Sequence, residues 1–212
     1  MSENPRDEQA TPKILGVVLF DGFELLDVFG PLEMFGNLGD RLDVLLVAQE
    51  PGPVSSGQGP QAVAAHGFDD CPPLDLIMVP SGQVRAHLED ERLLQFLRQR
   101  AADAELTTTV CNGSHLLAAT GLLDGRRATT NKMLFSQIAA DRPNADWVPE
   151  ARWVDDGDIV TASGVSAGMD MALHVVARLF GDEAAERLAR GTEYEWHRDA
   201  AWDPFAAQAG LV

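Results

Sequence analysis

Cys111 is the residue whose surroundings in the sequence best suit catalysis. It follows a predicted strand over residues 105–110, is followed by Asn112-Gly113, and precedes a predicted helix over residues 114–120. This order predicts a tight turn from strand to helix with the thiol above the sheet. A helix N-terminus lowers the pKa of a thiol, so we predict a nucleophilic thiolate. The alternative is a buried cysteine that serves only as a small hydrophobic residue.

Asp27 is the second candidate, because a carboxylate is not expected between Leu26 and Val28 and just before Phe29-Gly30-Pro31. Apolar surroundings raise the pKa of an acid, which could then donate a proton beside a thiolate. The alternative is an acid that caps a break in the helix. Glu24, three residues earlier, lies on the same predicted face and also fits a first-turn acid that the helix dipole favours.

Pro80-Ser81-Gly82 follows another predicted strand, where glycine lets backbone N–H groups point into a cleft as an oxyanion site. His115 lies one turn after Cys111 and so near the site, although a hydrogen-bonded helix histidine is the commoner case. His174, between apolar neighbours, is predicted to be a core residue. No cluster has metal-ligand spacing, and no phosphate-binding loop or dinucleotide motif is found, so no metal or cofactor is expected.

Strand-length apolar runs alternate with segments of helical period, which predicts a mostly parallel sheet with helices on both faces. Ligands in such folds bind beyond the carboxyl ends of the strands. Gly30-Pro31 should kink or restart its helix, and residues 51–59 are expected to be a surface excursion. We predict helices at 24–35, 90–102, 114–120, 132–140, 166–180 and 182–190, strands at 14–20, 42–48, 61–66, 74–80, 105–110 and 128–130, and a hairpin of 151–154 with 159–161.

The 212 residues carry 16 Lys and Arg against 33 Asp and Glu, a net charge of −17. This length suits one domain, and the charge disfavours nucleic acid, anionic membranes and anionic substrates, so a small neutral substrate is expected. The longest apolar run, 14–20, is far shorter than the roughly 20 residues that cross a bilayer. With no secretory signal and two unrelated cysteines, Cys71 and Cys111, a cytoplasmic location is predicted.

We divide the chain into a disordered leader at 1–13, a catalytic domain at 14–190 and a C-terminal tail at 191–212. The tail carries Trp196, Trp202 and Phe205 among acidic residues. We expect it to pack on the domain or at a dimer interface, the alternative being a disordered extension. The tail is too short and too acidic to be the DNA-binding region of a transcriptional regulator.

Six segments in this order resemble the ThiJ/PfpI superfamily, and most closely its isonitrile (isocyanide) hydratase branch. They are LDVFGP at 26–31, EPGPV at 50–54, LDLIMVP at 74–80, VCNGS at 110–114, GLLDGRRATT at 121–130 and SAGMDMAL at 166–173. The resemblance implies a flavodoxin-like three-layer sandwich, a homodimer, and no metal or organic cofactor. It also implies that Cys111 is the reactive cysteine and that Asp27 is the acid hydrogen-bonded to its thiol.

The resemblance further implies a hydratase that converts an isonitrile to an N-substituted formamide through a Cys111 thioimidate, with Asp27 handling the proton. Three positions depart from the pattern and bear on the substrate: Asn112 replaces a common Thr, Ser81-Gly82-Gln83 replaces a glycine-rich loop, and Asn131 replaces a common His. We place Ser81, Gly82, Asn112 and Gly113 at the oxyanion and substrate site. The alternatives are a cysteine redox or electrophile sensor and a non-catalytic ligand-binding protein.

Overall fold

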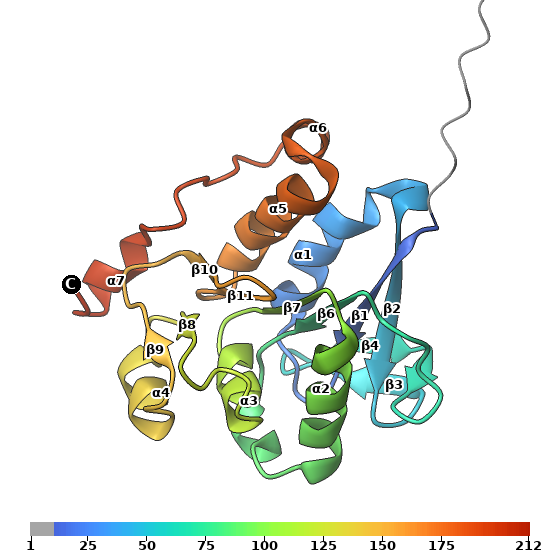
Figure 1. Cartoon of the computed structure of the whole chain (residues 1–212), viewed down its shortest axis with the longest axis horizontal. Coiled ribbons are helices and arrows are strands. Elements are labelled where there is room, and N and C mark those ends of the chain that lie inside the picture. Colours follow the sequence, from blue (N-terminus) through green and yellow to red (C-terminus); the bar gives the residue numbers. More distant parts are fainter. Residues whose placement is uncertain (1–10) are drawn as a thin grey trace, which may run out of the picture.

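The computed structural model describes residues 11–212 and is centred on a seven-stranded sheet (Figure 1). The strand order is β10-β11-β7-β6-β1-β2-β5, and all neighbours pair in parallel except β10 with β11. The strands are β1 (Lys13–Val18), β2 (Leu42–Ala48), β5 (His66–Gly67), β6 (Leu76–Val79), β7 (Leu106–Thr109), β10 (Trp153–Asp155) and β11 (Ile159–Ala162). The predicted mostly parallel sheet and the predicted hairpin of β10 and β11 are confirmed.

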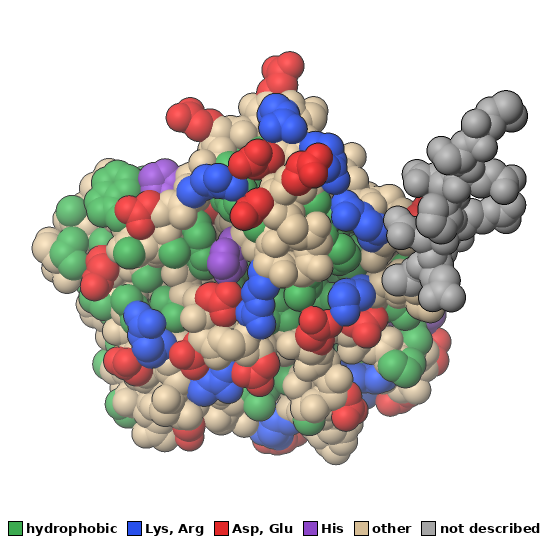
Figure 2. All heavy atoms as spheres, turned by 45° about the horizontal axis from the view of Figure 1, so that its top comes forward, with side chains coloured by type: hydrophobic (Ala, Val, Ile, Leu, Met, Phe, Trp, Pro, Cys, Tyr) green, Lys and Arg blue, Asp and Glu red, His purple; other side chains and the backbone are tan. Residues whose placement is uncertain are grey.

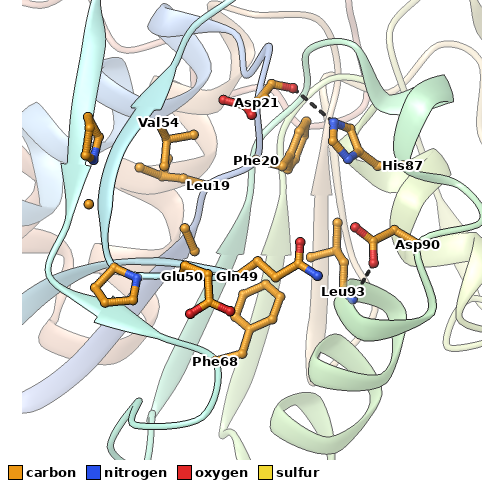
Figure 3. A pocket seen from close by; sticks show the side chains of 14 residues that line it. Leu19, Phe20, Asp21, Gln49, Glu50, Val54, Phe68, His87, Asp90 and Leu93 are labelled. Atoms are coloured by element: carbon orange, nitrogen blue, oxygen red, sulfur yellow. Dashed lines mark hydrogen bonds between the residues drawn. The ribbon is translucent and has the colours of Figure 1, made fainter.

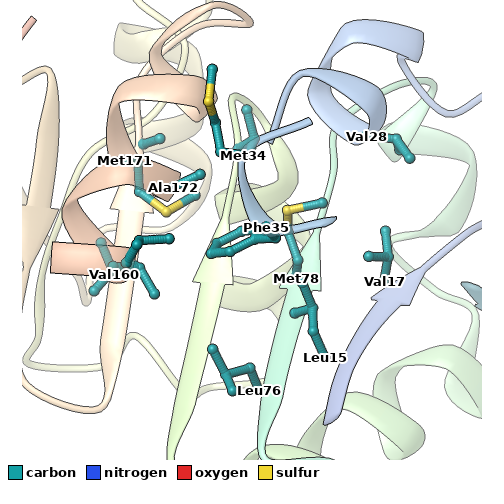
Figure 4. Close-up of a cluster of buried hydrophobic side chains, with 14 of the residues drawn as sticks. Leu15, Val17, Val28, Met34, Phe35, Leu76, Met78, Val160, Met171 and Ala172 are labelled. Carbon is teal, nitrogen blue, oxygen red and sulfur yellow. The ribbon is translucent and has the colours of Figure 1, made fainter. Parts of the chain in front are cut away.

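Helices cover both faces of this sheet, as expected for strands that are apolar on both sides. Alternate residues of β1 enter different cores: Leu15 and Val17 belong to one, and Val18 to the other. The first core lies under α1 (Leu25–Gly36), α5 (Ala167–Phe180) and α6 (Asp182–Gly191), and part of it is drawn in Figure 4. The second lies under α2 (Glu91–Asp103) and α3 (Gly113–Ala119). The three-layer, flavodoxin-like sandwich is thereby confirmed.

Helix α1 runs through Gly30-Pro31 as one element, so of the two predicted outcomes, a kink or a restart, the restart does not occur. Proline removes one backbone hydrogen bond from a helix interior, a loss that packing can offset. Here α1 packs along α5, and a Cβ placed on Gly30 would lie 3.0 Å from the Cγ of Met169. The close approach of the two helices at Gly30 therefore holds α1 continuous.

Other segments also differ from the sequence-based expectations. The predicted surface excursion contains β3 (Gly52–Ser55), which forms a separate two-stranded sheet with β4 (Gln61–Ala64). A second small sheet joins β8 (Arg127–Ala128) to β9 (Asp146–Trp147), next to α4 (Phe135–Asp141). His174 is not a core residue: it is half-buried, and its Nε2 lies 2.8 Å from Oδ2 of Asp155. Apolar neighbours in sequence did not reveal this exposed carboxylate partner.

The structure bears on both predicted terminal segments, the leader at 1–13 and the tail at 191–212. Of the predicted leader at 1–13, residues 1–10 lie outside the described residues, and Lys13 begins β1. The C-terminal residues run back along the domain to α7 (Pro204–Gln208): Arg152 N–H donates to Ala200 O, and Asp203 N–H donates to Glu150 O, each at 2.8 Å.

On the face shown in Figure 2, acidic and basic side chains are interspersed, and apolar side chains gather towards the end where α7 lies. Two exposed aromatic residues, Trp202 and Phe205, belong to this last part of the chain. Among residues 11–212, no helix is long and apolar enough to span a membrane, and no group of three or more metal-binding side chains is found.

Candidate active site

The carboxyl ends of four neighbouring strands bring the candidate residues together. In sheet order, β11 leads to Val165, β7 to Cys111, β6 to Ser81, and β1 to helix α1 with Asp27. Parallel strands that lie side by side end at one edge of a sheet, which is where such folds bind ligands. The sheet therefore assembles into one site residues that are up to 138 positions apart in the chain, from Asp27 to Val165 (165 − 27).

Cys111 occupies a sharp turn between β7 and α3. Its φ is +57°, a value that L-residues other than glycine seldom adopt. Its N–H donates to the carbonyls of Ala162 and Ser163 at 3.2 and 2.9 Å, and its own carbonyl accepts from the hydroxyls of Ser114 and Thr130. The backbone of the turn is thus held from both sides in a strained conformation, as in nucleophile elbows.

Gly113 makes this turn possible, since a Cβ at that position would lie 2.4 Å from Val79 O and 2.7 Å from Pro80 O. Both obstacles are backbone atoms, so Gly113→Ala must displace β6 or α3. We expect a loss of about 1–3 kcal/mol in the free energy of unfolding, measured by urea titration. Gly36→Ala is the matched control, because a Cβ there meets nothing within 4 Å. Equal stability of the two variants would contradict this account of the turn.

The thiol of Cys111 is enclosed by hydrogen-bond donors. Asn131 Nδ2 donates to Sγ at 3.2 Å, and the backbone N–H of Val165 is near enough to lower the pKa of the thiol. Nevertheless burial, followed by the charge of Asp27, raises the pKa of the Cys111 thiol, while hydrogen bonds from Ser81, Val165 and Asn131 act in the opposite direction. The prediction that the helix N-terminus lowers the pKa of the Cys111 thiol is therefore wrong, because the net change is a rise. Only 5% of the residue is exposed, so loss of hydration outweighs the helix.

Asp27 is fully buried and near enough for its charge to act on this thiol. Among residues 11–212, however, no hydrogen bond joins its carboxyl group to Sγ, contrary to what the resemblance implied. Its Oδ2 accepts from the N–H of Ser81 at 2.9 Å, whereas its Oδ1 has no hydrogen-bond partner. Burial raises the pKa of Asp27 to about 6, with a smaller contribution from the charge of Glu24 and an opposing one from Ser81. Asp27 therefore does not cap the helix. Glu24 is half-buried at the start of α1 and makes no capping hydrogen bond.

The expectation of free N–H groups at Ser81 and Gly82 is not met. Ser81 N–H is bonded to Asp27, and Gly82 N–H is directed to Asn112 Oδ1 at 3.3 Å. The loop is instead fastened to the start of α1: Glu24 N–H donates to Ser81 O, and a Cβ on Gly82 would lie 2.1 Å from Gly22 O. Gly82 thus permits a close backbone approach that places Asp27 next to Ser81.

Of the two remaining candidate residues, one contacts the thiol and the other does not. Asn131 contacts the sulfur directly, whereas His115 is buried on α3 and has no contact with the thiol. Val165 was missed by the sequence-based reasoning. The signal that could have found it is its position just after β11, at the same edge of the sheet as Cys111.

The carboxyl group of Asp27 and the thiol of Cys111 can exchange one proton, and the site can stabilise a negative charge on the sulfur. At neutral pH a carboxyl with a pKa of about 6 is mostly ionised, and a thiol with a raised pKa is protonated. Asp27 can accept the proton of Cys111 when the sulfur attacks an electrophile, and can then return it. Asn131 supplies a donor that stabilises negative charge on the sulfur during this transfer.

Comparison with known proteins identifies relatives of the chain. A family model described as the DJ-1/PfpI family matches residues 13–178. The isonitrile hydratase of Pseudomonas putida is 38% identical over 85% of this chain and 78% of its own length. A ThiJ/PfpI family protein from Pseudomonas syringae has a crystal structure that superimposes with a TM-score of 0.82 and 29% identity, over 98% of this chain and 88% of that one.

The chain is also similar to one part of a longer protein of another class, a transcriptional regulator. The HTH-type transcriptional regulator GbdR of Pseudomonas aeruginosa is 26% identical over 89% of this chain. The match spans only 52% of the regulator, so the chain corresponds to about half of that protein. Proteins with the same kind of domain thus include both an enzyme and regulators.

Proposed function

The chain belongs to the DJ-1/PfpI family, and from this we propose that it is a cysteine-dependent hydratase that converts an isonitrile into an N-substituted formamide. The observation that carries the proposal is the pairing of a thiol at a strained strand-to-helix turn with a fully buried carboxyl group whose pKa is about 6. The 38% identity to an isonitrile hydratase supports the choice of substrate.

In the proposed reaction, Asp27 takes the thiol proton while Sγ of Cys111 forms a bond to the terminal carbon of the isonitrile. Asp27 then protonates that carbon, which leaves a thioimidate, R–N=CH–S–Cys111. Water adds to the same carbon and transfers one proton to nitrogen. The carbon–sulfur bond breaks, the remaining hydroxyl proton returns to sulfur, and R–NH–CHO leaves. No histidine is required, because Asp27 serves as base and then as acid.

The decisive experiment measures both the product and the intermediate. Purified protein is mixed with one alkyl and one aryl isonitrile, formamide is quantified, and intact mass after acid quench reports the adduct on the protein. We expect formamide from the native protein and an adduct equal in mass to one isonitrile, and neither from Cys111→Ala. Absence of formamide with both substrates would reject the hydratase. A gain of two oxygens on Cys111 at low peroxide, with no formamide, would instead indicate the sensor.

Asp27 also determines the expected pH dependence. Its carboxylate must be ionised to accept the thiol proton, so kcat/KM should fall about tenfold per pH unit below the pKa of about 6. Glu24→Gln should move this acid limb to lower pH, because the charge of Glu24 contributes to the raised pKa of Asp27. The measurement is kcat/KM from pH 4.5 to 8. A profile without an acid limb above pH 5 would contradict the assignment of Asp27.

The homodimer and the cytoplasmic location stay predictions. Leu26 and Phe29 on α1 are 42% and 46% exposed, on the helix that carries Asp27, and offer an apolar contact for a second copy. Light scattering tests this directly, with Phe29→Ser as the variant expected to shift the mass towards the monomer.

A further inference from the structure

A cavity of about 510 Å³ lies next to the candidate active site, between the loop after β6 and helix α4. Its walls include both polar and apolar side chains. The lining residues include Gly82, Arg85, Asn112, His115, Leu134 and Gln137. This volume would accept a substituent of several heavy atoms.

Three residues of the cavity wall are linked to residues of the candidate active site, two by sequence and one by a hydrogen bond. Gly82 follows Ser81, and Asn112 follows Cys111. The N–H of Leu134 donates at 3.2 Å to Oδ1 of Asn131, whose Nδ2 donates to the sulfur. Gly82 and Asn112, the residues next to Ser81 and Cys111 in the chain, therefore place the cavity at the border of the site.

The charge of this cavity is opposite to that of the whole chain. Arg85 is its one permanently charged lining residue, and no carboxylate lines it. Within residues 11–212, no carboxylate lies within 4 Å of the guanidinium of Arg85 or of the nearby Arg142. On a chain with 33 acidic residues, a cavity lined by one unpaired arginine and by no carboxylate is locally positive.

His115 adds a buried polar group without a partner. Its side chain is 4% exposed, its Nε2 makes no hydrogen bond, and the nearest carboxylate oxygen, Asp141 Oδ2, is 3.8 Å away. Burial, followed by the charge of Arg142, lowers the pKa of His115, and Arg85 contributes in the same direction. A neutral imidazole can donate one hydrogen bond to a carboxylate, and an unsatisfied buried nitrogen favours such a ligand.

Another cavity, of about 270 Å³ beyond the ends of β1 and β2, differs in its charged groups (Figure 3). Its carboxylates are engaged: Asp21 accepts from Ser55 N–H, Glu50 pairs with Arg92, and Asp90 caps α2 at Leu93 N–H. Compared with this cavity, the one next to Cys111 has an unpaired cation and an unpartnered imidazole in its lining.

We propose that the cavity beside Cys111 holds the substituent of the electrophile and that this substituent carries a carboxylate, which Arg85 binds and His115 assists. The proposal rests on the proposed function and narrows it to carboxylate-bearing isonitriles. It also replaces the expectation of a neutral substrate, which was drawn from the net charge. The field at a cleft depends on the few charges that line it, so its sign can differ from that of the whole molecule.

The test uses thiol alkylation, which does not depend on hydratase activity. N-iodoacetyl-β-alanine and its primary amide differ in charge, and with each the sulfur of Cys111 displaces iodide and forms a carbon–sulfur bond. Alkylation rates at pH 7 are measured by intact mass, with Cys111→Ala as the correction for Cys71. Arg85→Gln should lower the acid-to-amide rate ratio by about 10- to 100-fold. Arg98→Gln, in an exposed pair with Glu91, should leave the ratio unchanged.

An unchanged ratio in Arg85→Gln, or equal changes in Arg85→Gln and Arg98→Gln, would overturn the proposal. Arg85 is exposed, so its replacement leaves folding intact. The hydratase assay separates the two hypotheses. If neutral isonitriles yield formamide and Arg85→Gln has no effect, the proposed carboxylate on the substrate is rejected and the proposed hydratase function is not. An Arg85-dependent ratio without any formamide would reject only the hydratase. If both hold, the KM of a carboxylate-bearing isonitrile should rise about 10- to 100-fold in Arg85→Gln, and that of its methyl ester should not.

Discussion

Asp27→Asn is expected to lower the rate of isonitrile hydration by about 10²–10⁴-fold, the contribution of a positioned acid–base group. The amide has nearly the same shape and can still face Ser81 N–H, but it neither accepts the thiol proton nor delivers it to the isonitrile carbon. The carboxyl group is fully buried and carries a pKa of about 6, so no water replaces it at this position. The measurement is kcat/KM for formamide formation.

Alkylation of Cys111 separates this loss from a damaged site. Asp27→Asn should keep a Cys111 thiol that iodoacetamide alkylates at pH 7, because the charge of Asp27 raises the pKa of the thiol and the amide removes that charge. Glu33→Gln is the matched control, since it makes the same change on an exposed acid of the same helix. Turnover within threefold of the native protein in Asp27→Asn would remove Asp27 from the mechanism.

The largest effect on stability is expected at Arg152, which lies in a buried ion cluster. Its Nε donates to Asp170 Oδ2 at 2.8 Å, and its Nη1 lies 3.7 Å from Asp203 Oδ2. Both carboxylates are almost fully buried, and Asp170 Oδ1 also accepts from Tyr194 OH and His197 N–H. One arginine therefore holds α5, the strand β10 region and the C-terminal residues together.

Arg152→Met should lower the free energy of unfolding by about 3–5 kcal/mol, because it leaves buried carboxylates without a counter-charge. Arg98→Met, which breaks the exposed pair with Glu91, should cost at most about 1 kcal/mol. Urea titration compares the two variants. A cost below 1 kcal/mol for Arg152→Met would contradict the cluster. Limited proteolysis should show cleavage after residue 191 before cleavage elsewhere, since the C-terminal residues lose their anchor.

Much of the fold could be predicted because it depends on local patterns. Apolar runs and helical periods located six of the seven strands of the main sheet, all but β5, and most of the helices. The residues around Cys111 also predicted its strand-to-helix turn. The helix over α1 was predicted, but the sequence could not decide whether Pro31 restarts it, because packing on α5, more than 100 residues later, offsets the hydrogen bond lost at Pro31. Strand β3 was missed because its Gly- and Pro-rich composition favours turns, whereas pairing with β4 makes it a strand.

The sequence by itself determined the order of the elements, the family and the two residues with the strongest chemical signal, Cys111 and Asp27. Only the tertiary structure decided how these residues behave. It places Asn131 against the thiol, raises the pKa of both acidic groups by burial, and engages the N–H groups of Ser81 and Gly82 in hydrogen bonds. Hydrogen bonds, hydration and local electrostatic fields act through space between distant parts of the chain. A net charge of −17 could therefore not indicate that the cavity beside Cys111 is lined by an unpaired arginine.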